Sequence, residues 1–152
     1  MRVLFAVDLE EPAGVCTEVA ELATRLGADL LILHVCSPGP TVFTSADPVS
    51  GLGDLAAYAL FDPELQKNLD EAEASAFENF LARSFTGPVK ASMRKGLPAT
   101  TILEDAEEHD VDLVILGHRH HSRLERFLMG DVASDVVNHA SRPVLLMPIT
   151  DD

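Results

Sequence analysis

Basic residues are scarce in this sequence. Its 152 residues include 11 Lys and Arg against 25 Asp and Glu, a formal net charge of −14 at pH 7. Nucleic acids and anionic membranes bind proteins through basic surfaces, so we expect neither as a partner. The same charge opposes capture of a small polyanion, unless the binding site is locally positive.

Long hydrophobic runs are also missing. No apolar stretch approaches the roughly 18–20 residues that cross a bilayer, which predicts that the chain does not insert into a membrane. The first residues, MRVLFAVD, hold one basic residue and a short apolar run that ends at Asp8. This pattern is too short and too soon acidic for a signal peptide. We therefore expect a cytoplasmic protein.

Cysteine is rare, and the two cysteines lack the spacing of metal ligands. Cys16 falls within an expected helix and Cys36 just beyond an expected strand. We interpret both as small, partly buried thiols in a reducing compartment. Hydrophobic residues make up 47% and charged residues 24%, a composition typical of a globular protein. The length predicts a single domain, 1–152, with one core.

Hydrophobic patterns along the chain alternate between strands and helices. The expected strands are 3–7, 30–35, 89–94, 111–117 and 142–148. Helices are expected from Pro12 to Gly27, from Asp62 to about Phe80, from Pro98, and over 130–140. An irregular connection covers about 36–61. Because the first two strands are apolar on both faces, the pattern predicts an α/β fold: a doubly wound, five-stranded parallel sheet in a three-layer, nucleotide-binding-like sandwich.

Helical spacing also predicts which residues face the core. In the second helix these are Leu65, Leu69, Ala72, Ala76 and Phe80. In the last helix they are Val132, Val136 and Val137. Strand 89–94 alternates weakly, which indicates an edge position with one wetter face.

The order of the strands predicts where a ligand binds. In doubly wound sheets, ligands lie beyond the carboxyl ends of strands, where the strand order reverses. Strands one and four are the expected neighbours at that point, and Asp8 and Gly117 stand at their carboxyl ends. A carboxylate such as Asp8 accepts hydrogen bonds from ribose hydroxyls or an adenine amino group. It is also suited to a simple turn or helix cap.

The segment that begins at Gly117, GHRHHSRLERFLMGD, occupies the position of a phosphate-binding loop. Three histidines, His118, His120 and His121, surround Arg119. Neighbouring side chains of a loop diverge, and no distant cysteine or carboxylate pair matches them, so we predict no metal site here. Contact of Arg119 and protonated histidines with an anion, and a plain solvated loop, both stay open.

Several separated motifs resemble the universal stress protein family. They are VLFAVD, LGADLLILHV, KGLPATTILEDAEEHDVDLVILG and GDVASDVVNHASRPVLLMP, in this order and over nearly the whole chain. The resemblance implies the five-stranded α/β fold, homodimers formed through the last strand, and a role in stress tolerance and signalling. Some members of the family bind ATP and others do not.

The phosphate motif of the ATP-binding members is only half kept. It reads Gly, two residues, Gly, nine residues, then Gly and Ser or Thr. Gly117 and Gly130 hold the first and last glycine positions, whereas His120 replaces the second glycine and Asp131 replaces the hydroxyl residue. A histidine hinders close approach of phosphate to the backbone, and a carboxylate repels it. At 4 Å and an effective dielectric constant of 20, one pair of like charges costs about 4 kcal/mol.

The start of the last helix partly offsets these losses. Its free amide groups favour an anion, and Mg²⁺ could bridge Asp131 to phosphate. Asp131 is also a good N-cap residue for that helix.

The resemblance assigns a set of residues to a nucleotide. Ala6, Val7, Asp8, Val35 and Leu116 would line the base and ribose region. Gly117, Arg119, His120, Gly130, Asp131, Val132 and Ala133 would face the phosphates. With a sound base pocket and a damaged phosphate loop, the site is expected to prefer AMP or adenosine to ATP, with Mg²⁺ required if ATP binds.

The sequence contains none of the catalytic motifs that we considered. The chain has no Gly-x-Ser-x-Gly elbow, no P-loop lysine and no Cys–His pair at a recognisable spacing, so we assign no catalytic residue. The first hypothesis is a cytoplasmic, homodimeric stress-response protein that regulates a protein partner and carries an altered adenine-nucleotide site. The alternatives are a slow nucleotide hydrolase and a ligand-free interaction module.

Overall fold

A five-stranded, entirely parallel sheet forms the centre of the molecule, with the strand order β3-β2-β1-β4-β5. The computed structural model describes residues 1–36, 62–119 and 132–150. The elements are β1 (Arg2–Val7), α1 (Ala13–Arg25), β2 (Asp29–Cys36), α3 (Pro63–Ser84), β3 (Lys90–Lys95), α4 (Pro98–Glu108), β4 (Leu113–Arg119), α5 (Val132–His139) and β5 (Val144–Ile149). This confirms the doubly wound α/β fold and the expected neighbours at the switch point, β1 and β4.

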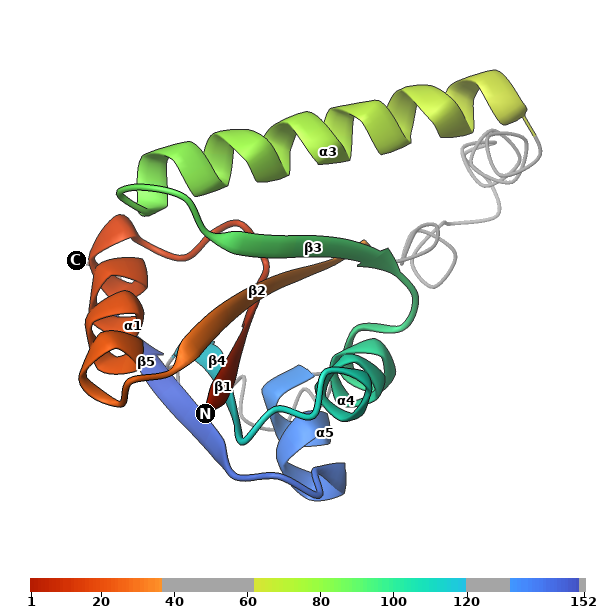
Figure 1. The fold of residues 1–152 in the computed structure, drawn as a ribbon. Coiled ribbons are helices and arrows are strands. Elements are labelled where there is room, and N and C mark those ends of the chain that lie inside the picture. The colour runs from red at the N-terminus through yellow and green to blue at the C-terminus, as the bar shows by residue number, and fades with distance from the viewer. Residues whose placement is uncertain (37–61, 120–131, 151–152) are drawn as a thin grey trace.

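Helices cover both faces of the sheet, α1 and α3 on one side and α4 and α5 on the other (Figure 1). Alternate residues of β1 pack into the two core layers, one on each face of the sheet. Phe5 packs with Val19 of α1 and Phe80 of α3, whereas Leu4 packs with Ile102 of α4 and others on the opposite face. A strand buried on both faces reads as a continuous apolar run, which is why β1 was recognisable.

Local chemistry sets the helix ends where the sequence predicted them. Asp62 caps α3, since its Oδ1 accepts from the backbone N–H of Glu64 at 3.0 Å, and Pro63 holds the first helical position, where its missing N–H is harmless. Gly27 follows α1 with a φ of 61°, the left-handed conformation that ends many helices.

The predicted core face of α3 is wrong except at Phe80, which is buried as expected. Leu65 and Leu69 are 40% and 54% exposed, and the buried side chains are Phe77, Phe80 and Ser84. Asp70 forms an ion pair with Lys95, the last residue of β3, so the turns before it extend beyond the sheet (Figure 1). The aromatic rings of Phe77 and Phe80 pack against the sheet instead. Ala72 and Ala76, which were also predicted to face inward, are exposed.

Smaller corrections concern α5 and the strand ends. Val136 of α5 is fully buried as expected, but Val137 is 48% exposed and Ala133 takes its place in the core. Cys36 is the last residue of β2 rather than the first residue after it. β4 continues to Arg119, two residues past its expected end. The irregular connection expected at 36–61 lies, from residue 37 on, outside the described residues.

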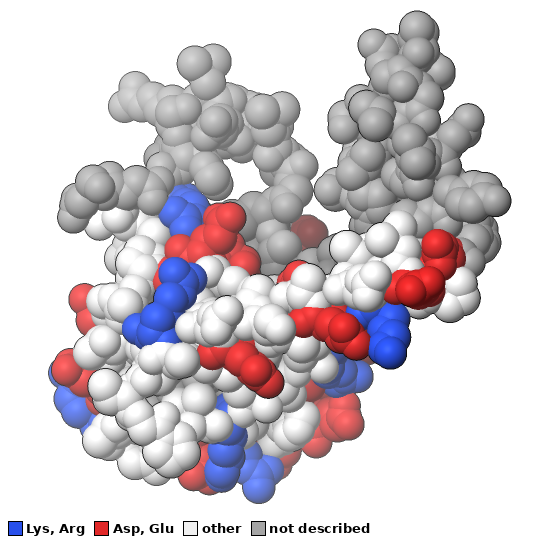
Figure 2. Space-filling view, turned by 90° about the horizontal axis from the view of Figure 1, so that it is seen from above, with Lys and Arg blue, Asp and Glu red and all other residues white. Residues whose placement is uncertain are grey.

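The surface seen from the α3 side mixes acidic with basic side chains (Figure 2). The expected edge position of strand 89–94 is confirmed, because β3 ends the sheet and four of its six residues are exposed. Among the described residues, no helix is long and apolar enough to cross a membrane.

Candidate functional site

The candidate site lies where β1 and β4 end side by side. Ala6 pairs with Leu116 in the parallel ladder, so Asp8 and Gly117 follow close together at the carboxyl edge. Strand order reverses between these two strands, and at such a point the loops diverge and leave room for a ligand.

Hydrogen bonds from several elements fix the loop that follows β1. The Asp8 backbone N–H donates to the Glu11 carboxylate at 2.9 Å, and the Glu10 N–H donates to Asp8 Oδ1 at 2.8 Å. Arg83 of α3 donates from Nη2 to the Leu9 carbonyl at 2.7 Å. Leu9 itself has a φ of 74°, a conformation that non-glycine residues rarely adopt. The loop is therefore held in one strained shape, as binding loops often are.

Arg119, predicted to contact an anion, joins the ends of β4 and β1. Its Nη2 donates to the Glu10 carbonyl at 2.9 Å and lies 3.9 Å from the Glu10 carboxylate. Its side chain stays 26% exposed. The guanidinium thus stands at the edge of the switch point, and the Glu10 carboxylate offsets part of its charge.

Glu11 is a buried carboxyl group at the centre of this arrangement. It is only 5% exposed, and burial, followed by the negative charge of Asp8, raises its pKa from 4.5 to about 7. No sequence pattern predicted a special role for Glu11. Its three-residue spacing from Asp8 is similar to that of a capping box, but α1 begins only at Ala13, so the spacing does not mark its burial.

Gly117 is needed because its neighbours leave no room for a side chain. A Cβ there would lie 2.7 Å from Cδ1 of Ile149 and 3.4 Å from Cγ of Glu11. The glycine lets the β1–α1 loop and β5 close against β4. A larger residue would displace the Ile149 side chain of β5 and press on Glu11 of the loop.

The apolar residues predicted to contact the nucleotide fall on both faces of the sheet. Ala6, Leu116 and Ala133 are buried in one cluster on the α4 and α5 side, with Val35 and Val132 half-buried against it. Val7 lies on the opposite face, in the core with α1 and α3. Ala6, Val7, Leu116 and Ala133 serve as core residues, and Val35 and Val132 stay partly exposed.

Several of the residues predicted to face the phosphates lie outside the described part of the chain. His120, Gly130 and Asp131 lie outside the described residues, as does His121. Only Gly117, His118 and Arg119 on one side and Val132 and Ala133 on the other are described.

His34, near the end of β2, is a packed, hydrogen-bonded residue. It is 5% exposed, its Nδ1 lies 3.0 Å from the Val7 carbonyl oxygen, and its Nε2 lies 2.5 Å from Oε1 of Glu73. Its ring also packs beside Phe77 at 5.6 Å between centroids. The partner Glu73 is distant in sequence, and no local pattern pointed to it.

Residues 1–148 match the model of the universal stress protein family. The chain belongs to this family. Among curated relatives, universal stress protein MJ0577 of Methanocaldococcus jannaschii is 26% identical over 153 residues, covering 96% of this chain and 93% of the relative. A universal stress protein of Thermus aquaticus is 28% identical over 148 residues, covering 95% and 96% of the two chains.

Solved structures share the same fold. The universal stress protein UspA from Lactobacillus plantarum is 25% identical with a TM-score of 0.58, and covers 97% of both chains. A universal stress protein in complex with cAMP is 18% identical with a TM-score of 0.59, and the match covers 99% of this chain and 98% of that one.

Proposed function

We propose that this chain is a stress-response regulatory protein that binds an adenine nucleotide at the carboxyl ends of β1 and β4, and that it prefers AMP or adenosine to ATP. The observation that carries the proposal is the pairing of a rigid switch-point loop with a phosphate motif altered at His120 and Asp131. The base end keeps its framework, and the phosphate end has lost two of its usual contacts.

Charge supports the preference for a small phosphate group. A monophosphate carries about two negative charges, and a triphosphate carries more. The chain itself bears −14, and Asp131 puts a carboxylate at the Ser or Thr position of the phosphate motif, so each additional phosphate is expected to be repelled further. A related universal stress protein solved with cAMP supports a nucleotide with one phosphate.

The exposed Asp8 carboxylate is the proposed acceptor for ribose hydroxyls. One of its oxygens already accepts from the Glu10 N–H, which leaves the other for a ligand. In Asp8→Asn one oxygen can keep the Glu10 bond, while the second position becomes an amide donor that cannot accept.

Calorimetric titration of the purified, nucleotide-free protein tests this function. We expect AMP and adenosine to bind, ATP without Mg²⁺ to bind at least about tenfold more weakly, and Asp8→Asn to weaken adenosine binding about tenfold. Asp29→Asn is the matched control, because Asp29 is an exposed aspartate at the amino end of β2, next to Lys90. It should bind adenosine as the wild type does.

Three results would contradict the proposal. Tighter binding of ATP than of AMP would mean that the altered loop still holds a triphosphate. Failure of every nucleotide to bind would favour an interaction module without a ligand. Steady ATP turnover that Asp8→Asn abolishes would favour a hydrolase.

A further inference from the structure

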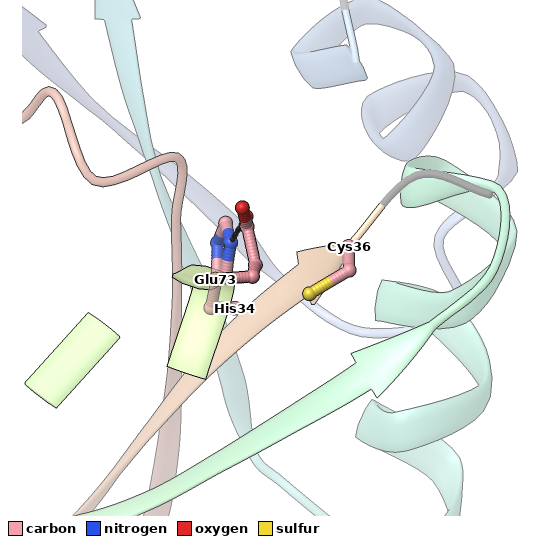
Figure 3. Close-up of side chains that lie close together, drawn as sticks. All are labelled: His34, Cys36 and Glu73. Atoms are coloured by element: carbon pink, nitrogen blue, oxygen red, sulfur yellow. Dashed lines mark hydrogen bonds and ion pairs between the residues drawn. The ribbon is translucent and has the colours of Figure 1, made fainter. Parts of the chain in front are cut away.

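We propose that His34, Cys36 and Glu73 form a binding site for a divalent, thiol-binding metal ion of the zinc class. The site is separate from the proposed nucleotide site and does not depend on it. It lies on the α3 face of the sheet, between the carboxyl end of β2 and the middle of α3 (Figure 3).

The strand geometry explains why the two β2 residues face the same way. Side chains at positions i and i+2 of a strand point to one face, so His34 and Cys36 both face α3, which supplies Glu73 from above. One ligand atom from each residue lies within 4.8 Å of the other two. Among the residues that the structure describes, no other group of three or more such side chains was found at this spacing.

One ring nitrogen of the histidine is already fixed as a metal site needs it. A backbone carbonyl only accepts hydrogen bonds, so the Nδ1 of His34 carries the proton and donates it to Val7 at 3.0 Å. Nε2 is directed at Glu73, whose carboxylate oxygen lies 2.5 Å away. The proton that this pair shares must leave to solvent before the Nε2 lone pair can bind a metal. Metal-binding histidines commonly have their second ring nitrogen fixed in this manner.

A small movement of one side chain would convert the hydrogen-bonded pair into a metal site. Two ligand atoms on a tetrahedral zinc ion lie roughly 3.4 Å apart, whereas Nε2 of His34 and Oε1 of Glu73 are 2.5 Å apart. The Glu73 side chain is 42% exposed and has room to rotate outward, while the His34 side chain, at 7%, stays fixed. The three residues leave a fourth position for water.

The charges of such a site balance. A neutral histidine, a thiolate and a carboxylate carry −2 in total, which a divalent ion cancels. The nearest base, Lys95, is held by Asp70 at 2.6 Å. Burial and then the Glu73 carboxylate raise the pKa of the Cys36 thiol, so the metal-free chain keeps a neutral thiol. On binding, the ion displaces this proton to solvent.

Cobalt(II) titration provides the test, because a cobalt–thiolate bond has a charge-transfer absorption that histidine and carboxylate ligands lack. We expect one Co²⁺ per chain with this absorption, displaced by Zn²⁺. Cys36→Ala should abolish the absorption. Cys16→Ala, which removes the other, buried thiol, should keep it.

A second pair of variants tests the carboxylate. Glu73→Gln keeps a hydrogen-bonding partner for His34 but loses the charge, and should weaken Zn²⁺ binding by at least about tenfold. Glu71→Gln, on the same helix and paired only weakly with Lys67 at 3.9 Å, should bind like the wild type. Absence of the thiolate absorption, its survival in Cys36→Ala, or equal effects of the two glutamate variants would overturn the proposal and leave His34–Glu73 as a structural pair.

Discussion

Glu11, at the switch point, has two opposing effects on the stability of the folded chain. Its carboxylate accepts the Asp8 N–H at 2.9 Å, which stabilises the strained loop. Burial beneath Gly117 nevertheless raises its pKa to about 7, because a charged group loses its hydration there. The same side chain therefore organises the loop and destabilises the folded chain once it ionises.

The pH dependence of stability follows from this raised pKa. Between pH 4.5 and about 7 the unfolded chain loses the Glu11 proton while the folded chain retains it, so rising pH favours unfolding. At 1.36 kcal/mol per pKa unit, the loss reaches at most about 3 kcal/mol. It levels off above pH 7.

We therefore expect Glu11→Gln to gain stability relative to the wild type as the pH rises. The difference in the free energy of unfolding should grow by about 1–3 kcal/mol between pH 4.5 and pH 8. Urea unfolding at several pH values measures it. Glu10→Gln is the control, since Glu10 is exposed and its removal should leave the pH slope unchanged. Parallel pH curves for Glu11→Gln and the wild type would contradict this account.

Residue roles that depend on the local backbone were predictable from the sequence, whereas roles that depend on tertiary contacts were not. Asp62 and Pro63 were predicted as the start of a helix, because cap and proline act on their own backbone. Glu11 was missed, since its unusual state comes from burial under β4. The His34–Glu73 contact was missed because it joins residues 39 positions apart in the chain.

At the scale of elements, the two edges of the sheet differ. The edge strand β3 carries Lys90, Arg94 and Lys95, and charges on an edge discourage pairing with another chain. The other edge, β5, reads VLLMPI and has no charged residue. Apolar edges of this kind need a partner, so we propose that a homodimer forms through β5.

Leu146 is the position at which to test the dimer. It is 38% exposed, whereas Leu145 packs against the core on the α1 side, so a charge at Leu146 spares the fold. We expect Leu146→Glu to weaken dimerisation by at least about tenfold, because it places a charge in an apolar contact. Sedimentation equilibrium measures the dissociation constant.

Leu97→Glu is the control, on a leucine 67% exposed next to the opposite edge. It should leave the dimerisation constant unchanged. A Leu146→Glu variant that assembles as tightly as the wild type would exclude β5 as the interface.

Element boundaries show where sequence patterns lose precision. The start of α3 was predicted correctly, but its inward face was wrong except at Phe80. Helical periodicity fixes the spacing of apolar residues along the helix, but it does not decide which apolar stripe contacts the sheet. Phe77 and Phe80 bury more apolar area than Leu65 and Leu69. Since the helix begins beyond the end of β3, its first leucines have no sheet beneath them.

At the scale of the whole molecule, alternation of strands and helices was enough to predict the architecture. Parallel strands with right-handed crossovers leave few arrangements, and β1 and β4 are neighbours in the sheet, as expected. The ligand could not be predicted in the same way. It depends on a few side chains, and the phosphate segment that holds His120 and Asp131 lies outside the described residues.

The net charge of −14 acts on the entire molecule and opposes every anionic ligand. This long-range term is screened by salt. Comparing ATP with AMP in two variants at one ionic strength therefore separates the local effect of the phosphate loop from the general repulsion.

The most direct test is the ratio of ATP to AMP affinity in the wild type and in the double variant His120→Gly/Asp131→Ser, measured by calorimetry. The variant restores the glycine and hydroxyl of the family motif, and serine, like aspartate, is a favoured N-cap residue. We predict that the wild type prefers AMP and that the variant gains at least about tenfold in ATP affinity, with little change for AMP. An unchanged ratio, or a wild type that already prefers ATP, would contradict the account.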